Sequence, residues 1–342
     1  MTSPYTSLAA RAFWKTAVTE RAPLDPGDLY QPKFPIPPKA WIMTAGSCFA
    51  QHIGRALRGA NMKIMDAEAL PRFVPDEVAE TYGYRQYSAR YGNIYTARQL
   101  AQLLAEARGD FSPADPVWEK NGRYFDSQRP SVEPDGLESP DEVLRHRQHH
   151  LNQVATAIRR TGLFIFTFGL TEAWTHRESG TVYPTAPGTQ CGTYNPDQHA
   201  FVNFGYQEIM NDFLTARRIL KRSNKRMRFI ITVSPVPLTA TATGKHIEVA
   251  NSYSKSVLRA VCGRLADDHD DIDYFPSYEI ITSLNNRGIY YAANKRNVTP
   301  EGVTRAMEMF LHAHGLSQQA GHSDDEQHDP HCDDALLEAF AG

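Results

Sequence analysis

Ser47, in the string Gly46-Ser47-Cys48-Phe49-Ala50, is the side chain whose surroundings best suit nucleophilic chemistry. The string follows an apolar run at residues 41–45 and precedes apolar residues at helical spacing, which predicts a strand, a tight turn and a helix. Such a turn exposes the hydroxyl at the helix N-terminus, where backbone N–H groups stabilise a developing oxyanion. The alternative is that Ser47 only caps the helix, a position that favours serine in any case. Cys48 offers a thiol at the same helix end, but its place in the turn favours an inward, structural role.

The elements that must position Ser47 alternate between strands and helices. Apolar runs predict strands at residues 41–45, 62–65, 163–168, 229–233 and 272–275. Apolar residues at helical spacing predict helices at about 49–59, 96–107, 139–158, 207–221, 249–265 and 301–314. Five strands separated by helices imply an α/β fold with a parallel sheet in a three-layer α/β/α sandwich. Ligands of such sheets bind at the carboxyl ends of the strands, so the residues after each strand are the first candidates for a site.

The predicted organisation of the 342 residues is one α/β domain with a leading arm and a tail. Residues 1–40 are rich in proline and are expected to form an extended arm on the body. Residues 41–317 form the domain, with insertions at about 70–135 and 177–205. Residues 318–342 hold seven acids, three histidines and no lysine or arginine, which predicts a solvated tail. The tail residues that could chelate a metal are His322, His328, His331 and Cys332. A solvated tail is the preferred interpretation, so neither a metal nor another cofactor is expected.

Composition and charge exclude several classes of function. The 36 basic and 39 acidic residues give a net charge of −3, so no bulk positive field attracts nucleic acid or an anionic membrane. No apolar stretch approaches the roughly 18 residues of a membrane span, and the N-terminal residues do not resemble a signal peptide. The four cysteines lie far apart, which argues against a disulfide framework and fits a cytoplasmic protein. No dinucleotide fingerprint or P-loop follows any predicted strand. A homo-oligomer is compatible with the sequence.

Six motifs, in order along the chain, resemble the GSCFA-domain family over roughly residues 40–312. The motifs are Gly46-Ser-Cys-Phe-Ala50, Tyr91-Gly-Asn-Ile-Tyr-Thr96, Phe168-Gly-Leu-Thr-Glu-Ala-Trp174, Thr232-Val-Ser-Pro-Val236, Tyr253-Ser-Lys-Ser256 and Tyr274-Phe-Pro-Ser-Tyr-Glu279. That family is similar to the SGNH (GDSL-like) hydrolases and acyltransferases, whose flavodoxin-like five-stranded sheet has the order 2-1-3-4-5. The resemblance implies that Ser47 is the nucleophile and that Gly92 or Asn93 is the oxyanion donor of the second block.

Two blocks depart from the SGNH pattern. The third block is usually Gly-x-Asn and here ends in Thr171, so a hydroxyl, or Asn93, must replace the side-chain amide. Where an SGNH enzyme has Asp-x-x-His before the final helix, this chain has Asn294-Lys-Arg-Asn297. Both the base and its orienting acid are therefore missing, and a serine without a base is a weak nucleophile.

A replacement base must come from another loop, and His246 is the predicted one. It follows the fourth strand, on the reactive edge of the sheet, and the acids predicted to orient it are Glu172 and Glu279. For each acid the alternative is an ordinary salt bridge.

The remaining histidines and polar residues are given lesser roles. His52 is interpreted as a core or surface residue, and His176 and His199 as residues of a lid. The cluster of His146, His149 and His150 is expected to form a solvated helix face. The residues expected to line the substrate site, besides those of the second block, are Thr171, Trp174 and Ser234.

The sequence therefore predicts a serine-dependent ester hydrolase or O-acyltransferase, with a carbohydrate ester as the substrate class by analogy. The alternative is a non-catalytic protein that binds a glycan or acyl ligand in the same pocket. A third hypothesis, a metal-dependent hydrolase, requires the tail to be ordered against the body. The group beside the Ser47 hydroxyl distinguishes the first two: a histidine favours the enzyme, whereas Asn297 or an apolar group favours the binding protein.

Overall fold

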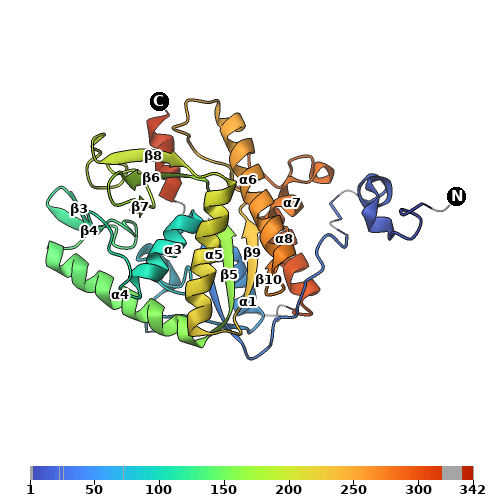
Figure 1. Ribbon diagram of the computed structural model, residues 1–342, viewed down its shortest axis with the longest axis horizontal. Helices are drawn as coiled ribbons and strands as arrows, with labels where there is room; N and C mark the ends of the chain where they lie inside the picture. Colours follow the sequence, from blue (N-terminus) through green and yellow to red (C-terminus); the bar gives the residue numbers. More distant parts are fainter. Residues whose placement is uncertain (1–2, 23, 26, 72, 318–332, 342) are drawn as a thin grey trace.

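The computed structural model describes residues 3–341 apart from 23, 26, 72 and 318–332. Five parallel strands form its central sheet (Figure 1). They are β1 (Trp41–Gly46), β2 (Lys63–Ile64), β5 (Thr161–Phe168), β9 (Arg228–Val233) and β10 (Ile272–Tyr274). Their spatial order is β10-β9-β5-β1-β2. If only the strands of this sheet are counted along the chain, the order is 2-1-3-4-5. The predicted α/β fold with a five-stranded parallel sheet is confirmed.

Helices cover both faces of the sheet and create two hydrophobic cores (Figure 1). One face carries α3 (Ala97–Glu106), α4 (Pro140–Arg160), α5 (Tyr206–Ser223) and α6 (Ile247–Asp268). The other carries α1 (Ala50–Gly59), α7 (Ser277–Thr282) and α8 (Pro300–Ala313). Successive side chains of β5 alternate between the cores: Phe164 and Phe166 belong to the first, Leu163 and Ile165 to the second. Because both faces are buried, the strand is an unbroken apolar run, as the sequence indicated.

Side-chain caps fix where two of the long helices begin. Ser139 accepts the Glu142 N–H at 3.3 Å, and Pro140 occupies the first helical position of α4. Thr96 and Gln99 form a capping box at the start of α3. These polar residues satisfy N–H groups that a helix start leaves without intrahelical partners.

The two insertions have secondary structure of their own. Residues 70–135 contain α2 (Asp76–Thr81), α3 and a hairpin of β3 (Val117–Lys120) with β4 (Arg123–Asp126). The segment after β5 forms a small antiparallel sheet of order β7-β6-β8 beyond the carboxyl end of β5 (Figure 1). Its strands are β6 (Glu172–His176), β7 (Val182–Tyr183) and β8 (His199–Asn203).

The N-terminal arm is less extended than its proline content indicated. It contains two short helical turns, η1 (Ala10–Ala12) and η2 (Lys15–Thr19), and this part stands away from the body (Figure 1). Residues closer to β1 do lie on the body, because Tyr30, Phe34 and Ile36 are buried in the second core. The proline-rich part therefore adds to the core, whereas local helical turns form before it.

The C-terminal region is described only in part. The four metal-ligand candidates of the tail lie outside the described residues, and the chain is described again as the short helix η4 (Asp333–Phe340). Within the described ranges, no group of three or more His, Cys, Asp or Glu side chains could hold a metal ion. None of the helices in those ranges combines the length and the hydropathy that a membrane span requires.

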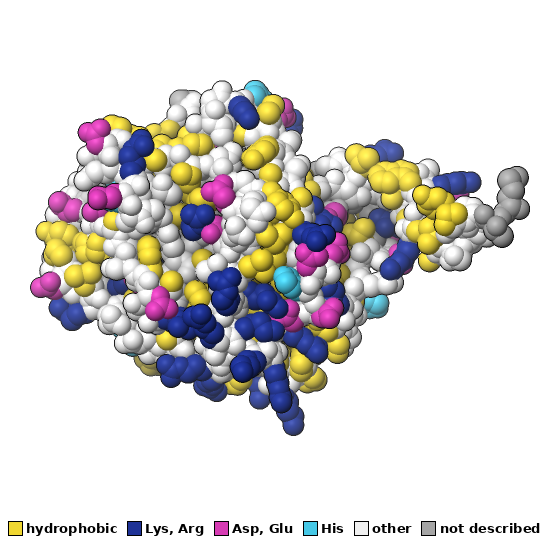
Figure 2. All heavy atoms as spheres, viewed as in Figure 1, with side chains coloured by type: hydrophobic (Ala, Val, Ile, Leu, Met, Phe, Trp, Pro, Cys, Tyr) yellow, Lys and Arg dark blue, Asp and Glu magenta, His cyan; other side chains and the backbone are white. Residues whose placement is uncertain are grey.

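Lysine and arginine side chains gather where α4 and α5 end, at the amino ends of the sheet strands, whereas Ser47 lies at the carboxyl end (Figure 2). Positive charge at a helix C-terminus complements the helix dipole. Two of these cations are also engaged: Arg160 lies over the Trp41 ring at 4.7 Å, and Lys221 forms an ion pair with Asp271. The basic residues in the last turns of α4 and α5 thus complement the dipoles of these helices.

Candidate active site

The turn that carries Ser47 depends on the glycine before it. Gly46 ends β1 with φ of 139°, and a Cβ at this position would lie 2.5 Å from the carbonyl oxygen of Thr167 on β5. A side chain is therefore excluded for two reasons, the backbone conformation and the close approach of β5. The Ser47 N–H then donates to that same carbonyl at 3.2 Å. This contact holds the serine at the carboxyl end of the sheet.

The Ser47 hydroxyl is buried and has no partner in the described structure. The residue is 3% exposed, and its Oγ has no hydrogen-bond partner among the described atoms. Helix α1 starts at Ala50 after an N-cap residue, Phe49, that makes no side-chain cap. The interpretation of Ser47 as a helix cap is therefore wrong. The neighbouring Cys48 is buried, as expected for an inward side chain.

The loop after β5 packs directly on this serine. A Cβ on Gly169 would lie 2.9 Å from the Ser47 Cβ and 3.2 Å from the Tyr95 ring. The N–H groups of Gly169 and Leu170 both donate to the Tyr95 carbonyl at 3.0 Å. The motifs around residues 91–96 and 168–174, far apart in sequence, are thus joined beside Ser47.

Helix α6 holds the other side of the same loop. The Lys255 ammonium donates to the Gly169 carbonyl at 2.9 Å, and the Ser254 hydroxyl accepts the Thr171 N–H at 3.3 Å. Lys255, Ser254 and Thr171 are all buried, and the Thr171 hydroxyl itself has no partner among the described atoms. Thr171 therefore lies in the loop after β5, with a hydroxyl that a ligand could engage.

The loop of residues 91–96, which carries the predicted oxyanion donors, runs beside the end of β1. The Ile94 N–H donates to the Gly46 carbonyl at 2.9 Å, and Gly92 adopts a left-handed φ of 67°. The Tyr87 hydroxyl donates to Oδ1 of Asn93, which is buried. The predicted oxyanion residues Gly92 and Asn93 are thus on the loop that lines the serine turn.

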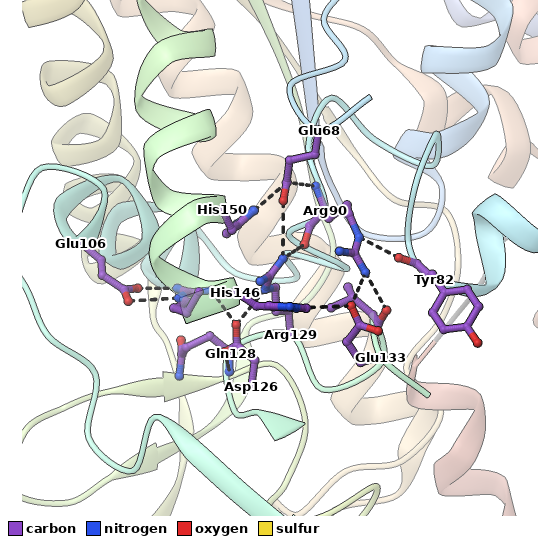
Figure 3. Close-up of polar contacts among 12 residues, drawn as sticks. Glu68, Tyr82, Arg90, Glu106, Asp126, Gln128, Arg129, Glu133, His146 and His150 are labelled. Atoms are coloured by element: carbon purple, nitrogen blue, oxygen red, sulfur yellow. Dashed lines mark hydrogen bonds and ion pairs between the residues drawn. The ribbon is translucent and has the colours of Figure 1, made fainter. Parts of the chain in front are cut away.

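A network of buried ion pairs holds the start of this loop, at Arg90 (Figure 3). The Arg90 N–H donates to Oε2 of Glu68 at 2.7 Å, and the Arg129 guanidinium donates to the Arg90 carbonyl at 3.1 Å. The Arg90 guanidinium pairs with Glu133 at 2.7 Å. Both peptide groups of Arg90, two residues before Gly92, are therefore fixed by charged partners.

The network continues into the hairpin and helix α4. Asp126 of β4 accepts from Arg129 at 2.7 Å and lies 3.5 Å from Arg147 of α4. His150 of α4 lies 2.7 Å from Glu68 through its Nδ1 and is fully buried (Figure 3). The expectation that His150 belongs to a solvated face is therefore wrong: the insertion covers this side of α4.

Burial and pairing shift the pKa values in this network. Burial lowers the pKa of His150 to about 4, so its imidazole is neutral at pH 7. Burial would raise the pKa of Glu68, but the hydrogen bond with His150 and the charge of Arg129 lower it to about 2. A neutral His150 thus donates its Nδ1–H to an ionised Glu68.

The structure does not bring the predicted base to Ser47. His246 is the N-cap of α6, where its Nδ1 accepts the Glu248 N–H at 3.3 Å, and its side chain is 68% exposed. Glu172 accepts from the Thr241 hydroxyl at 2.8 Å, and burial raises its pKa. Glu279 accepts from Arg259 and from the Tyr274 hydroxyl. Among the described residues, neither acid is hydrogen-bonded to a histidine.

Of the remaining predicted residues, Ser234 directly follows β9 and Trp174 lies in the middle of β6. The Ser234 N–H donates to the Phe168 carbonyl at 2.8 Å, and its Oγ accepts the Val236 N–H at 3.3 Å, so it closes the turn after β9. Trp174 lies on β6 in edge-to-face contact with Tyr194 and Phe201, at ring-centre distances of 5.3 and 5.7 Å. It is thus part of an aromatic group on the small sheet.

The segment of residues 294–297, compared above with the Asp-x-x-His block of SGNH enzymes, forms a turn stabilised by the side-chain amide of Asn294. Oδ1 of Asn294 accepts the N–H groups of Arg296 and Asn297, both at 3.0 Å. The Arg296 guanidinium lies 3.9 Å from Glu338 of η4. An amide in this role neither accepts a proton from a serine nor orients an imidazole.

Lys255 is the site residue that the sequence analysis missed. Its motif, Tyr253-Ser-Lys-Ser256, was noted without a role for the lysine. The available signal was its spacing: Lys255 lies three and seven residues before Leu258 and Cys262, on the inward face of α6. A lysine at such a position is buried and must find a polar partner.

Comparison with known protein families yields a match. Residues 41–310 match the model of the GSCFA family, which covers the whole sheet and every site residue named above. No curated protein matches the chain.

Proposed function

The chain belongs to the GSCFA family, and from this premise we propose that it is a serine-dependent acyl-transfer enzyme, an ester hydrolase or an O-acyltransferase. The observation that carries the proposal is the Ser47 hydroxyl, which is buried at the carboxyl end of β1 with no partner among the described atoms. Leaving a buried hydroxyl unpaired costs about 1–3 kcal/mol. A functional role for this hydroxyl explains why such a cost is retained.

The reaction we propose has two acyl-transfer steps. Oγ of Ser47 attacks the ester carbonyl carbon and forms an acyl-serine, while the alcohol leaves with the serine proton. Water or a second alcohol then takes the acyl group and returns a proton to Oγ. The N-terminus of α1 and the loop of Gly92 and Asn93 would stabilise the negative carbonyl oxygen. The strand order 2-1-3-4-5 supports the further likeness to SGNH enzymes.

An ester of a carbohydrate is the substrate class we favour. Trp174, Tyr194 and Phe201 form an aromatic group on the small sheet beyond the end of β5, and Tyr194 is 45% exposed. Aromatic rings with a polar edge suit the mixed apolar and polar faces of a sugar.

A second candidate function is non-catalytic binding of a glycan or acyl ligand. The specific observation in its favour is that no imidazole of the described residues is hydrogen-bonded to Ser47, and that Asn294 stabilises a turn where SGNH enzymes have their acid and base. The same pocket would then hold a ligand without activating the serine.

Covalent labelling separates the two functions. The purified protein is treated with a fluorophosphonate probe and, separately, with a generic acetyl ester, and the modified peptide is identified by mass spectrometry. The enzyme hypothesis expects an adduct on Ser47 that is lost in Ser47→Ala and kept in the matched variant Cys48→Ala. An adduct on Cys48 alone would reassign the nucleophile. If neither residue reacts in folded protein, the binding function is preferred.

A further inference from the structure

A fully buried lysine, Lys255, is hydrogen-bonded to Gly169, the residue that packs against Ser47. Lys255 is 1% exposed, and its Nζ donates to the Gly169 carbonyl at 2.9 Å. Lysine is almost never buried to this extent unless its ammonium is held by polar groups. The cost of burying this charge calls for an explanation beyond packing, since an apolar side chain would fill the same space.

The group that Lys255 holds is the one that packs on the serine. Gly169 lies against Ser47, and its carbonyl belongs to the peptide group whose N–H, from Leu170, donates to the Tyr95 carbonyl. A peptide group is planar, so a partner at each end fixes its orientation. Lys255 and Tyr95 therefore hold this one peptide from opposite sides.

The same peptide joins the two loops of the site. Tyr95 belongs to the same loop as Gly92 and Asn93, the predicted oxyanion donors. A shift of the Gly169–Leu170 peptide would therefore move Gly169, which packs against Ser47, relative to this loop. An ammonium on the carbonyl also polarises the peptide and strengthens the hydrogen bond from its N–H.

We propose that Lys255 is a positioning residue for Ser47. Its hydrogen bond to the Gly169 carbonyl keeps the serine hydroxyl in a fixed position relative to the loop of residues 91–96. This role rests on the proposed acyl-transfer function. Lys255 acts through Gly169, and the reacting atoms remain those of Ser47 and its substrate.

Two measurements test the role, one of which is independent of activity. Amide hydrogen exchange is measured at Gly169 and Leu170 in the wild type, in Lys255→Met, which removes the donor, and in Lys255→Gln, which keeps an N–H donor without the charge. Inactivation by the fluorophosphonate probe is measured in the same proteins as a maximal rate and a half-saturating concentration. Leu265→Ala is the control, because this residue is buried on the same helix ten positions further along.

The proposal expects exchange at both amides to be at least tenfold faster in Lys255→Met, with β5 unchanged. The maximal inactivation rate should fall roughly tenfold to hundredfold, the range expected for a displaced reacting group, while the half-saturating concentration stays within about twofold. Lys255→Gln should lie between Lys255→Met and the wild type, and it supplies the comparison if Lys255→Met does not fold. Leu265→Ala should lose stability without either change.

Each contrary result has a distinct meaning. Unchanged exchange at Gly169 and Leu170 would overturn the role of Lys255. Equal effects in Lys255→Met and Leu265→Ala would overturn it too, because both would then report lost stability. If wild-type Ser47 does not react, the acyl-transfer function fails, and the exchange data still decide whether Lys255 holds the loop.

Discussion

Gly169 leaves no room for a side chain beside Ser47, because a Cβ on Gly169 would lie 2.9 Å from the Cβ of the serine. The backbone of Gly169 is not in the left-handed region, so an alanine is opposed by steric contacts alone: this one, and two with the ring and the carbonyl oxygen of Tyr95 at 3.2 and 3.3 Å. We expect Gly169→Ala to push the serine turn away and to slow labelling of Ser47 by roughly tenfold to hundredfold. Chemical denaturation should show a loss of about 1–3 kcal/mol, as for overpacking of a core.

The control for this prediction is Gly162→Ala at the other end of β5. Its Cβ would meet the Ala40 Cβ at 3.5 Å, an ordinary contact. The control should label at the wild-type rate. Equal labelling of both variants would show that Gly169 does not set the position of the serine.

Gly46 provides a stability prediction at the same turn. Alanine there would combine a φ of 139° with a Cβ 2.5 Å from the Thr167 carbonyl. We expect Gly46→Ala to destabilise the protein by more than about 3 kcal/mol, because a strained backbone and a clash with main chain add together. Gly54→Ala, in helix α1, should be neutral or stabilising, since its Cβ would be 3.5 Å from its nearest neighbour and alanine favours helix. Thermal unfolding of the two variants decides this, and similar midpoints would contradict it.

The sequence predicted the sheet well because the relevant signals are local. The apolar run of β5 and the Gly46-Ser47 turn are readable without tertiary contacts, and the structure places both as expected. The contact of Lys255 with Gly169 could not be predicted, because it joins residues 86 positions apart. The direction of a loop is equally nonlocal, and His246 therefore lies in solvent at a helix start.

The ionic network was also beyond sequence analysis. Residues 70–135 lack a clear apolar period, and the charges of Arg90 and Arg129 would ordinarily indicate a surface. In the structure Arg90 pairs with Glu133, and Arg129 pairs with Asp126, so that acidic side chains neutralise both cations between the insertion and α4. The hydrophobicity pattern of a sequence does not indicate which oppositely charged side chains are buried together.

Replacement of His246 tests two different expectations: the sequence predicts a general base, whereas the structure shows a helix cap. As the general base, its loss should slow the reaction by about 100- to 10,000-fold. Its exposed ring and its bond to the Glu248 N–H favour a different result. We expect His246→Ala to cost about 1 kcal/mol, typical of a lost cap, and to leave the labelling rate of Ser47 within about twofold. A hundredfold loss of labelling in folded His246→Ala would show that this loop closes over the serine during the reaction.

The Glu68–His150 pair should make stability depend on pH below neutrality. The pKa of His150 is about 4 in the folded protein, against about 6.5 in an unfolded chain. Between these values the unfolded chain binds a proton that the folded chain refuses, so the free energy of unfolding falls as the pH falls from 6.5 to 4. One proton corresponds to a slope of about 1.4 kcal/mol per pH unit. The pKa of Glu68, about 2, adds a further loss between pH 4.5 and 2, where the unfolded carboxylate is already protonated.

Replacement of the imidazole isolates its share of this pH dependence. Denaturation is measured at several pH values between 7 and 4.5 in the wild type, in His150→Gln and in His149→Gln, whose side chain is exposed on the same helix. His150→Gln should be less stable at pH 7, because Glu68 loses a partner. Its free energy of unfolding should nevertheless fall less steeply in acid, by up to about 1.4 kcal/mol per pH unit. His149→Gln should retain the wild-type slope. Parallel pH curves for all three proteins would mean that His150 takes up its proton as readily in the folded chain as in the unfolded one, and the buried network would then not hold it neutral.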